Sequence, residues 1–135
     1  MTSPILAIDL DGTLLAGAEI PQANIDALQE AVARDYTIAI ATARWHQMAS
    51  EVLERAEVPG FIIGCNGAHI YEPSSQRDLL DLRIDLELAN AVMDRARAFG
   101  GLLTATFEND VVVFSDEPST RVLPSYIQSV KGYPP

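Results

Sequence analysis

The chain contains 135 residues, 48% of them hydrophobic and 21% charged, which is the composition of one globular domain with a sizeable core. Its 19 acidic and 9 basic residues give a formal net charge of −10, and this sign argues against nucleic acid or an anionic membrane as a partner. The single cysteine, Cys65, excludes an internal disulfide, and no apolar run reaches the length of a membrane span. Because the N-terminal residues also do not resemble a signal peptide, we expect a cytoplasmic protein.

The first part of the chain alternates between strand patterns and helix patterns. The apolar run over residues 5–10 predicts a strand that is buried on both faces. The elements that follow are expected over residues 21–34 (helix), 37–41 (strand), 46–58 (helix) and 61–64 (strand). This alternation is typical of an α/β fold in which helices cover a parallel sheet.

After Gly67 the pattern changes to one that favours antiparallel strands. Strands are expected over residues 69–72, 78–84, 102–107 and 111–114, with helices over 85–99 and 119–130. Asp85 is placed to cap the first of these helices, and Gly100-Gly101 to end it. We therefore divide the chain into a parallel α/β unit over residues 1–74 and a second unit over residues 75–135.

Polar residues stand at the carboxyl ends of the three parallel strands, where open sheets of this kind bind ligands. They are Asp9, Asp11, Gly12 and Thr13 after the first strand, Thr42 and Arg44 after the second, and Asn66 after the third. Because side chains alternate along a strand, Asp9 and Asp11 are expected on one side, with Leu10 turned into the core. We expect these residues to converge on one site.

The two neighbouring aspartates favour phosphoryl chemistry with a metal ion. Two carboxylates about 5 Å apart repel by roughly 3 kcal/mol at an effective dielectric near 20, and a Mg²⁺ ion would relieve this repulsion. One aspartate can then attack phosphorus and form an aspartyl phosphate, while the other transfers protons. Gly12 allows a tight turn whose N–H groups can hold phosphate oxygens, and Thr42 can donate a further hydrogen bond.

The motifs DLDGTLL, TAR and CNGAHIY resemble those of the haloacid dehalogenase-like (HAD) superfamily, and within it the Cof-like branch of sugar and small-metabolite phosphatases. The resemblance implies part of a Rossmannoid catalytic core over residues 1–74, followed by the first part of an α/β cap over 75–135. It also implies that Asp9 is the nucleophile and Asp11 the general acid/base. Asp9 and the Asp11 carbonyl would bind Mg²⁺, and Thr42 would bind phosphate together with Gly12 and Thr13. For Arg44 and Asn66 it implies contact with the substrate.

The sequence departs from this family in its later motifs. The family completes its site with a lysine and with an acidic pair, usually inside GDxxND, and both come after the cap. No acidic pair of that form follows residue 67, and Lys131 lies too early, within the segment that resembles the cap. The chain therefore resembles the first half of a phosphatase. We expect the complete protein to hydrolyse small phosphomonoesters, and this piece alone to be slow or inactive.

Each candidate residue also has a purely structural interpretation. Asp-Gly is a common turn pair, Thr42 could cap the following helix, and Arg44 could be a solvated charge. Other residues are expected to be structural: Asn66-Gly67 as a turn, Cys65 as a small hydrophobe, His46 and His69 at the surface or in turns, and Trp45 and Tyr71 between core and cap.

Three other functions agree with parts of the sequence. A phosphoacceptor receiver fits the length and the acidic pair, but it needs an aspartate after the third strand, where this chain reads IGCNGA. An inactive or interacting protein that binds metal or phosphate remains open, as does a phosphomutase or phosphotransferase that uses the same aspartate. The substrate is expected to be a small phosphorylated metabolite, and the oligomeric state is left open, although an unpaired sheet edge could drive association.

Overall fold

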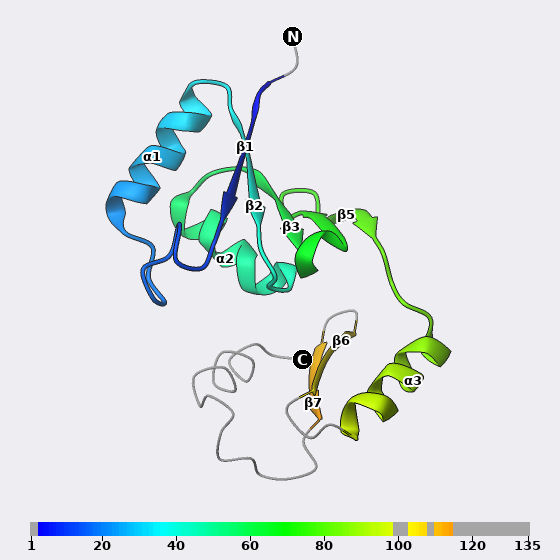
Figure 1. Ribbon diagram of the computed structural model, residues 1–135. Coiled ribbons are helices and arrows are strands. Elements are labelled where there is room, and N and C mark those ends of the chain that lie inside the picture. The colour runs from blue at the N-terminus through cyan, green and yellow to red at the C-terminus, as the bar shows by residue number, and fades with distance from the viewer. Residues whose placement is uncertain (1–2, 99–102, 108–109, 115–135) are drawn as a thin grey trace. The chain divides into compact units, whose positions relative to one another are not determined.

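A five-stranded mixed sheet forms the first unit of the chain (Figure 1). The computed structural model describes residues 3–98, 103–107 and 110–114. The strands lie in the order of the sequence: β1 (Ile5–Asp9), β2 (Thr37–Ala41), β3 (Gly60–Gly64), β4 (His69–Glu72) and β5 (Arg77–Asp81). β1, β2 and β3 are parallel, whereas β4 and β5 are antiparallel to their neighbours. The change of pattern after Gly67 is thus confirmed.

Two helices connect the parallel strands and pack on the sheet. α1 (Gln22–Ala33) begins after Pro21, and α2 (His46–Ala56) ends at Glu57, whose backbone is left-handed with φ 54°. The helices contact each other, α1 contacts β2, and α2 contacts β3 and β4. Their apolar faces and the central strands form the core, whose fully buried side chains are Leu10, Leu28, Ile38, Ile40 and Ile62. The predicted α/β fold is confirmed.

The first strand is less buried than its apolar sequence predicts. Along β1 the side chains alternate between exposed and half-buried, and Ile5 is 70% exposed. The expectation of burial on both faces was therefore wrong. The reason is its position, because among the described strands β1 is an edge strand that pairs only with β2.

The second unit contains a helix and a hairpin. α3 (Leu86–Arg97) is capped as predicted, since the Asp85 carboxylate accepts a hydrogen bond of 2.8 Å from the Leu88 N–H. β6 (Leu103–Phe107) and β7 (Asp110–Phe114) pair antiparallel, which confirms the predicted hairpin. Gly100-Gly101 and the helix expected over 119–130 lie outside the described residues. Among the residues that the structure describes, we find no helix with the length and hydrophobicity of a membrane span.

The contacts divide the chain into compact units of residues Met1–Arg83 and Ile84–Pro135. This division lies later than the boundary expected between residues 74 and 75. That boundary falls in the turn between β4 and β5, and these strands belong to one sheet. β5 is therefore a structural part of the first unit.

Two histidines of the first unit are buried, contrary to their expected positions at the surface or in turns. His46 is 8% exposed and His69 is 3% exposed. Both rings belong to a group of aromatic side chains from α2 and β4. They are therefore buried by residues that are distant from them in the sequence. Burial lowers the pKa of His46 to about 4; the electrostatic interaction with His69 acts in the same direction, and that with Asp78 opposes the change.

This pKa predicts a loss of stability in mild acid. The folded protein favours the neutral form of His46. The stability that this neutral side chain contributes is therefore fully present above the ordinary pKa of 6.5, and it is lost as the pH falls towards about 4. Across this range we expect the free energy of unfolding to fall by up to about 3 kcal/mol more in the wild type than in His46→Phe. Urea unfolding followed by the fluorescence of Trp45, the one tryptophan, measures this difference. Parallel pH profiles for the two proteins would contradict it.

Candidate active site

The first part of the site is the turn that follows β1. Asp9 ends the strand, and the next residue, Leu10, is fully buried, as predicted. The Asp9 carboxylate accepts a hydrogen bond of 3.2 Å from Thr13 Oγ1, and its carbonyl oxygen accepts one of 3.4 Å from the Leu14 N–H. Gly12 lies in this turn with φ +78°, a backbone conformation that suits glycine. The turn brings the Thr13 hydroxyl to the Asp9 side chain.

Asp11 is held by an arginine from the end of the next strand. Arg44 Nε donates to Asp11 Oδ2 over 2.9 Å, and Arg44 Nη2 donates to Asp11 Oδ1. Such a two-bond contact fixes the orientation of the carboxylate as well as offsetting its charge. The Asp11 side chain is 54% exposed and that of Arg44 29% exposed, so both remain within reach of a ligand. The predicted convergence of the first two strand ends is present for this pair.

Thr42 lies in the same loop as Arg44 and contacts its backbone. It is buried, its N–H donates to the Ile63 carbonyl over 2.9 Å, and its Oγ1 accepts a hydrogen bond of 3.1 Å from the Arg44 N–H. Thr42 does not cap α2, because the residue before that helix is Trp45. Since the hydroxyl oxygen accepts from Arg44, its own hydrogen is available to a ligand oxygen.

The turn after β3 is hydrogen-bonded to the loop after β2. Residues Cys65–Gly67 form a short 3₁₀ turn, in which Cys65 and Asn66 both have positive φ, 50° and 55°. The Cys65 N–H donates to the Arg44 carbonyl over 3.0 Å, and the Asn66 N–H donates to the Thr42 carbonyl over 3.3 Å. Backbone in this region costs about 1–3 kcal/mol per residue and is found mostly at functional sites. The Asn66-Gly67 turn is as predicted.

The Cys65 side chain is not suited to nucleophilic chemistry. It is half-buried, and burial together with the negative charge of Asp81 raises the pKa of its thiol. The neutral thiol is therefore favoured, whereas the thiolate is the reactive species. This agrees with its interpretation as a small hydrophobe.

The oxygen atoms of the turn after β1 supply part of the coordination that a hard cation needs. The candidate ligands are oxygen atoms of Asp9 and Asp11, and Mg²⁺ typically takes one or two carboxylates together with water and phosphate oxygens. Among the described residues, no three or more His, Cys, Asp or Glu side chains gather closely enough to hold a metal ion. The residues present fit Mg²⁺ bound by the turn after β1 and by substrate oxygens.

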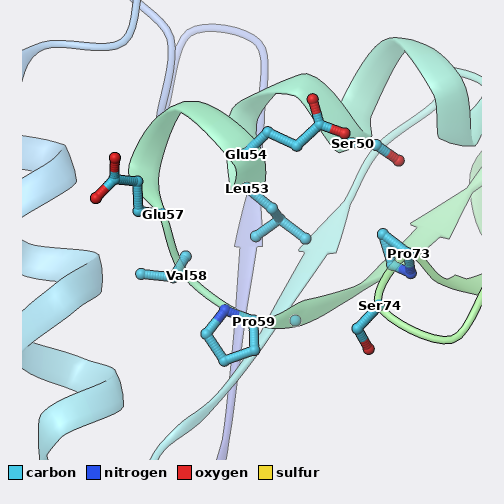
Figure 2. A pocket seen from close by; sticks show the side chains of 9 residues that line it. Ser50, Leu53, Glu54, Glu57, Val58, Pro59, Pro73 and Ser74 are labelled. Atoms are coloured by element: carbon cyan, nitrogen blue, oxygen red, sulfur yellow. The ribbon is translucent and has the colours of Figure 1, made fainter.

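A cavity of about 280 Å³ lies elsewhere, at the amino end of β3 (Figure 2). Figure 2 shows Leu53 and Pro73 on either side of it, with the Glu57 carboxylate pointing away. Its lining residues are Ser50, Leu53, Glu54, Glu57, Val58, Pro59, Gly60, Pro73 and Ser74. None of the predicted site residues is among them, so this cavity is separate from the strand ends that carry the motifs.

Sequence reasoning missed Gly64, on which the spacing of the loops depends. A Cβ atom at this position would lie 2.9 Å from the Arg44 carbonyl oxygen, a separation that real Cβ atoms essentially never show. The glycine therefore allows the Arg44 loop to approach the end of β3. The only signal in the sequence was a glycine at the end of a buried strand, which also has simpler explanations.

The chain is similar in sequence to known hydrolases. A family model for haloacid dehalogenase-like hydrolases matches residues 6–132. A protein of Metamycoplasma hominis named "Putative phosphatase in upp 3'region" is 36% identical over 74 residues, which cover 52% of this chain and 26% of that protein. The chain thus spans about a quarter of the length of this curated relative.

Solved structures share the fold. A haloacid dehalogenase-like hydrolase from B. subtilis is 25% identical with a TM-score of 0.72, covering 82% of this chain and 38% of that protein. The HAD subclass IIB sugar phosphatase BT4131 is 27% identical with a TM-score of 0.68, covering 82% of this chain and 43% of that protein. The chain spans less than half of either structure.

The close approach at Gly64 predicts a specific effect of Gly64→Ala. The added methyl group must displace the Arg44 carbonyl, which is backbone and is held by the Cys65 N–H. We expect a loss of about 1–3 kcal/mol in the free energy of unfolding. We also expect a shift of the fluorescence emission maximum of Trp45, which follows Arg44 in the sequence. Gly17→Ala is the control, because no atom lies within 4 Å of its new Cβ and only backbone strain is added. An unshifted emission in Gly64→Ala would contradict the role of this glycine.

Proposed function

The chain belongs to the family of haloacid dehalogenase-like hydrolases, and from this premise we propose that the protein is a Mg²⁺-dependent phosphatase of sugar phosphates or other small phosphorylated metabolites. The contact that carries the proposal joins Asp11 in the turn after β1 to Arg44 in the loop after β2, beside Thr42. The phosphatase name of the Metamycoplasma relative and the sugar phosphatase BT4131 support the reaction class.

Asp9 is the proposed nucleophile. Its carboxylate oxygen attacks phosphorus, a new oxygen–phosphorus bond forms, and the bond from phosphorus to the leaving alkoxide breaks. The products of this step are an aspartyl phosphate and the alcohol. The hydrogen bond from Thr13 Oγ1 orients the Asp9 carboxylate for the attack.

Asp11 is the proposed general acid/base. It gives a proton to the leaving alkoxide in the first step, and in the second step it takes a proton from the water that attacks the aspartyl phosphate. Inorganic phosphate then leaves and Asp9 is regenerated. Arg44 orients Asp11, and because it contacts both Asp11 oxygens, one of these two hydrogen bonds must open when Asp11 carries the proton that it gives to the leaving group.

Hydrogen-bond donors around the turn would hold the phosphoryl oxygens. The Thr42 hydroxyl can donate while its oxygen still accepts from the Arg44 N–H. The N–H groups of Gly12 and Thr13 are further proposed donors, and Arg44 and Asn66 are proposed to contact the rest of the substrate. A Mg²⁺ ion held by Asp9 and by the Asp11 carbonyl would neutralise part of the phosphoryl charge.

The two units would divide this work. Met1–Arg83 would form the first part of the catalytic core, and Ile84–Pro135 would form the first part of a cap that restricts access and sets substrate specificity. The motif residues Asp9, Asp11, Thr42, Arg44 and Asn66 all lie in the first unit.

A second candidate is a protein that binds metal or phosphate without turnover. It is favoured by the absence, within the described residues, of a group of three or more His, Cys, Asp or Glu side chains that could hold a metal ion. A phosphomutase or phosphotransferase would use the same aspartyl phosphate and would pass it to an acceptor other than water. Turnover with water alone, measured as release of inorganic phosphate, distinguishes the three.

The role of Asp9 predicts the effect of Asp9→Asn. In the longest natural form of the protein, with Mg²⁺ and p-nitrophenyl phosphate, we expect turnover to fall at least about a thousandfold, because an amide is not a nucleophile towards phosphorus. Asp26→Asn removes an exposed carboxylate from α1 and serves as the control. Turnover that survives in Asp9→Asn would exclude Asp9 as the nucleophile, and no turnover in the wild type would favour the non-enzymatic candidate.

The role of Asp11 predicts a dependence on the leaving group. Nitrophenolate leaves readily without a proton, whereas the alkoxide of a sugar phosphate does not. We therefore expect Asp11→Asn to lose about 10²–10⁴ in kcat/KM for glucose 6-phosphate, with a much smaller loss for p-nitrophenyl phosphate, because kcat/KM reports the step in which the leaving group departs. Measuring both substrates on the same preparation controls for folding. Equal losses of kcat/KM for both substrates would contradict a role of Asp11 as general acid.

A further inference from the structure

Two segments that are distant in sequence are joined by aromatic rings. Trp45 and His46 stand at the start of α2, and His69 and Tyr71 lie on β4. The rings of Trp45 and His69 are stacked, with centroids 4.7 Å apart and planes 18° apart. The rings of His46 and Tyr71 are also stacked, with centroids 4.0 Å apart. Each stack therefore bridges the start of α2 and β4, and we call these four residues the ring cluster.

A carboxylate from the neighbouring strand fixes one ring of the cluster. His69 Nε2 lies 2.7 Å from Asp78 Oδ1, which is a hydrogen-bond distance. The His69 side chain is buried, whereas that of Asp78 is half exposed. This contact orients the His69 ring, and the oriented ring in turn stacks against Trp45.

The ring cluster is more polar than packing alone requires. Three of its nitrogen atoms are buried and have no hydrogen-bond partner among the residues that the structure describes: Trp45 Nε1, His46 Nδ1 and His69 Nδ1. Burying a polar atom without a partner is unfavourable, and phenylalanine or leucine would fill the same space without this penalty. The arrangement therefore points to a function for the rings beyond filling the core.

The ring cluster is attached directly to the candidate active site. Trp45 follows Arg44, so fixing the Trp45 ring restricts the backbone of Arg44. The Arg44 N–H donates to Thr42 and its carbonyl accepts from Cys65, so that backbone is held from both sides. Its guanidinium then reaches Asp11. A continuous chain of contacts runs from Asp78 through His69 and Trp45 to the proposed catalytic carboxylate.

We propose that His69 is a positioning residue, which holds Trp45 by ring stacking and thereby keeps Arg44 in place against Asp11. The functional value of this placement rests on the proposed phosphatase reaction, in which Asp11 transfers protons. The structural part of the inference does not need that reaction, because it concerns only the Arg44–Asp11 contact.

The test compares His69→Leu with His69→Phe. Both side chains are apolar and fill the core, but only phenylalanine can stack on Trp45. In ¹⁵N NMR spectra of the full chain, the Arg44 Nε–H signal is assigned by its loss in Arg44→Lys, and its exchange with water is measured. We expect exchange to be about tenfold faster in His69→Leu than in the wild type, because opening of the contact exposes this proton. In His69→Phe we expect a rate close to that of the wild type.

Controls separate this effect from general loosening of the fold. Asp26→Asn, on α1 and outside the ring cluster, should leave Arg44 exchange unchanged. Equal exchange in His69→Leu and His69→Phe would overturn the proposal. If neither variant folds, Trp45→Leu and Trp45→Phe repeat the comparison from the other ring, and equal rates there overturn it too. Because no substrate is used, failure of the phosphatase proposal would show in the Asp9→Asn assay and not in this one.

Discussion

The contact between Arg44 and Asp11 links the turn after β1 to the loop after β2, and the geometry of the candidate site depends on it. Two carboxylates with a single residue between them repel each other, by roughly 3 kcal/mol at a separation of about 5 Å and an effective dielectric near 20. A divalent ion is one way to relieve that repulsion. The structure contains another, because the Arg44 guanidinium offsets the charge of Asp11 while Asp9 accepts from Thr13. The acidic pair is therefore compatible with the fold before any metal binds.

The position of Arg44 follows in turn from the end of β3. Gly64 leaves room for the Arg44 carbonyl, and the left-handed backbone of Cys65 and Asn66 directs their N–H groups to the preceding loop. Neither feature is favourable by itself, since glycine is conformationally free in the unfolded chain and a left-handed non-glycine residue is strained. Their combination at one strand end is explained by the need to hold the loops after β2 and β3 together. Local strain thus supports a precise arrangement of polar groups.

The sequence predicted what depends on local pattern and missed what depends on neighbours in space. The bounds of β2 and β4 were predicted correctly, because periodicity and turn residues set them locally. The exposure of β1 was not, because an apolar strand reads alike at an edge and in the centre of a sheet. The His69–Asp78 contact was also missed, since it joins two strands whose pairing includes a register shift between Ile70 and Tyr71. The approach of Arg44 to Asp11 was predicted, because these residues follow the ends of neighbouring parallel strands.

The hairpin of β4 and β5 connects the site to the rest of the chain. β4 carries two rings of the ring cluster, β5 carries Asp78, and the segment after β5 leads to the second unit. The first residue of that segment, Leu82, donates its N–H to the Ala68 carbonyl over 2.8 Å, directly after the turn that contains Asn66. The same hairpin therefore supports the loop of Arg44 and begins the connection between units. The strands next to that connection are thus the ones that carry the ring cluster and Asp78, and through Trp45 they contact the loop of Arg44.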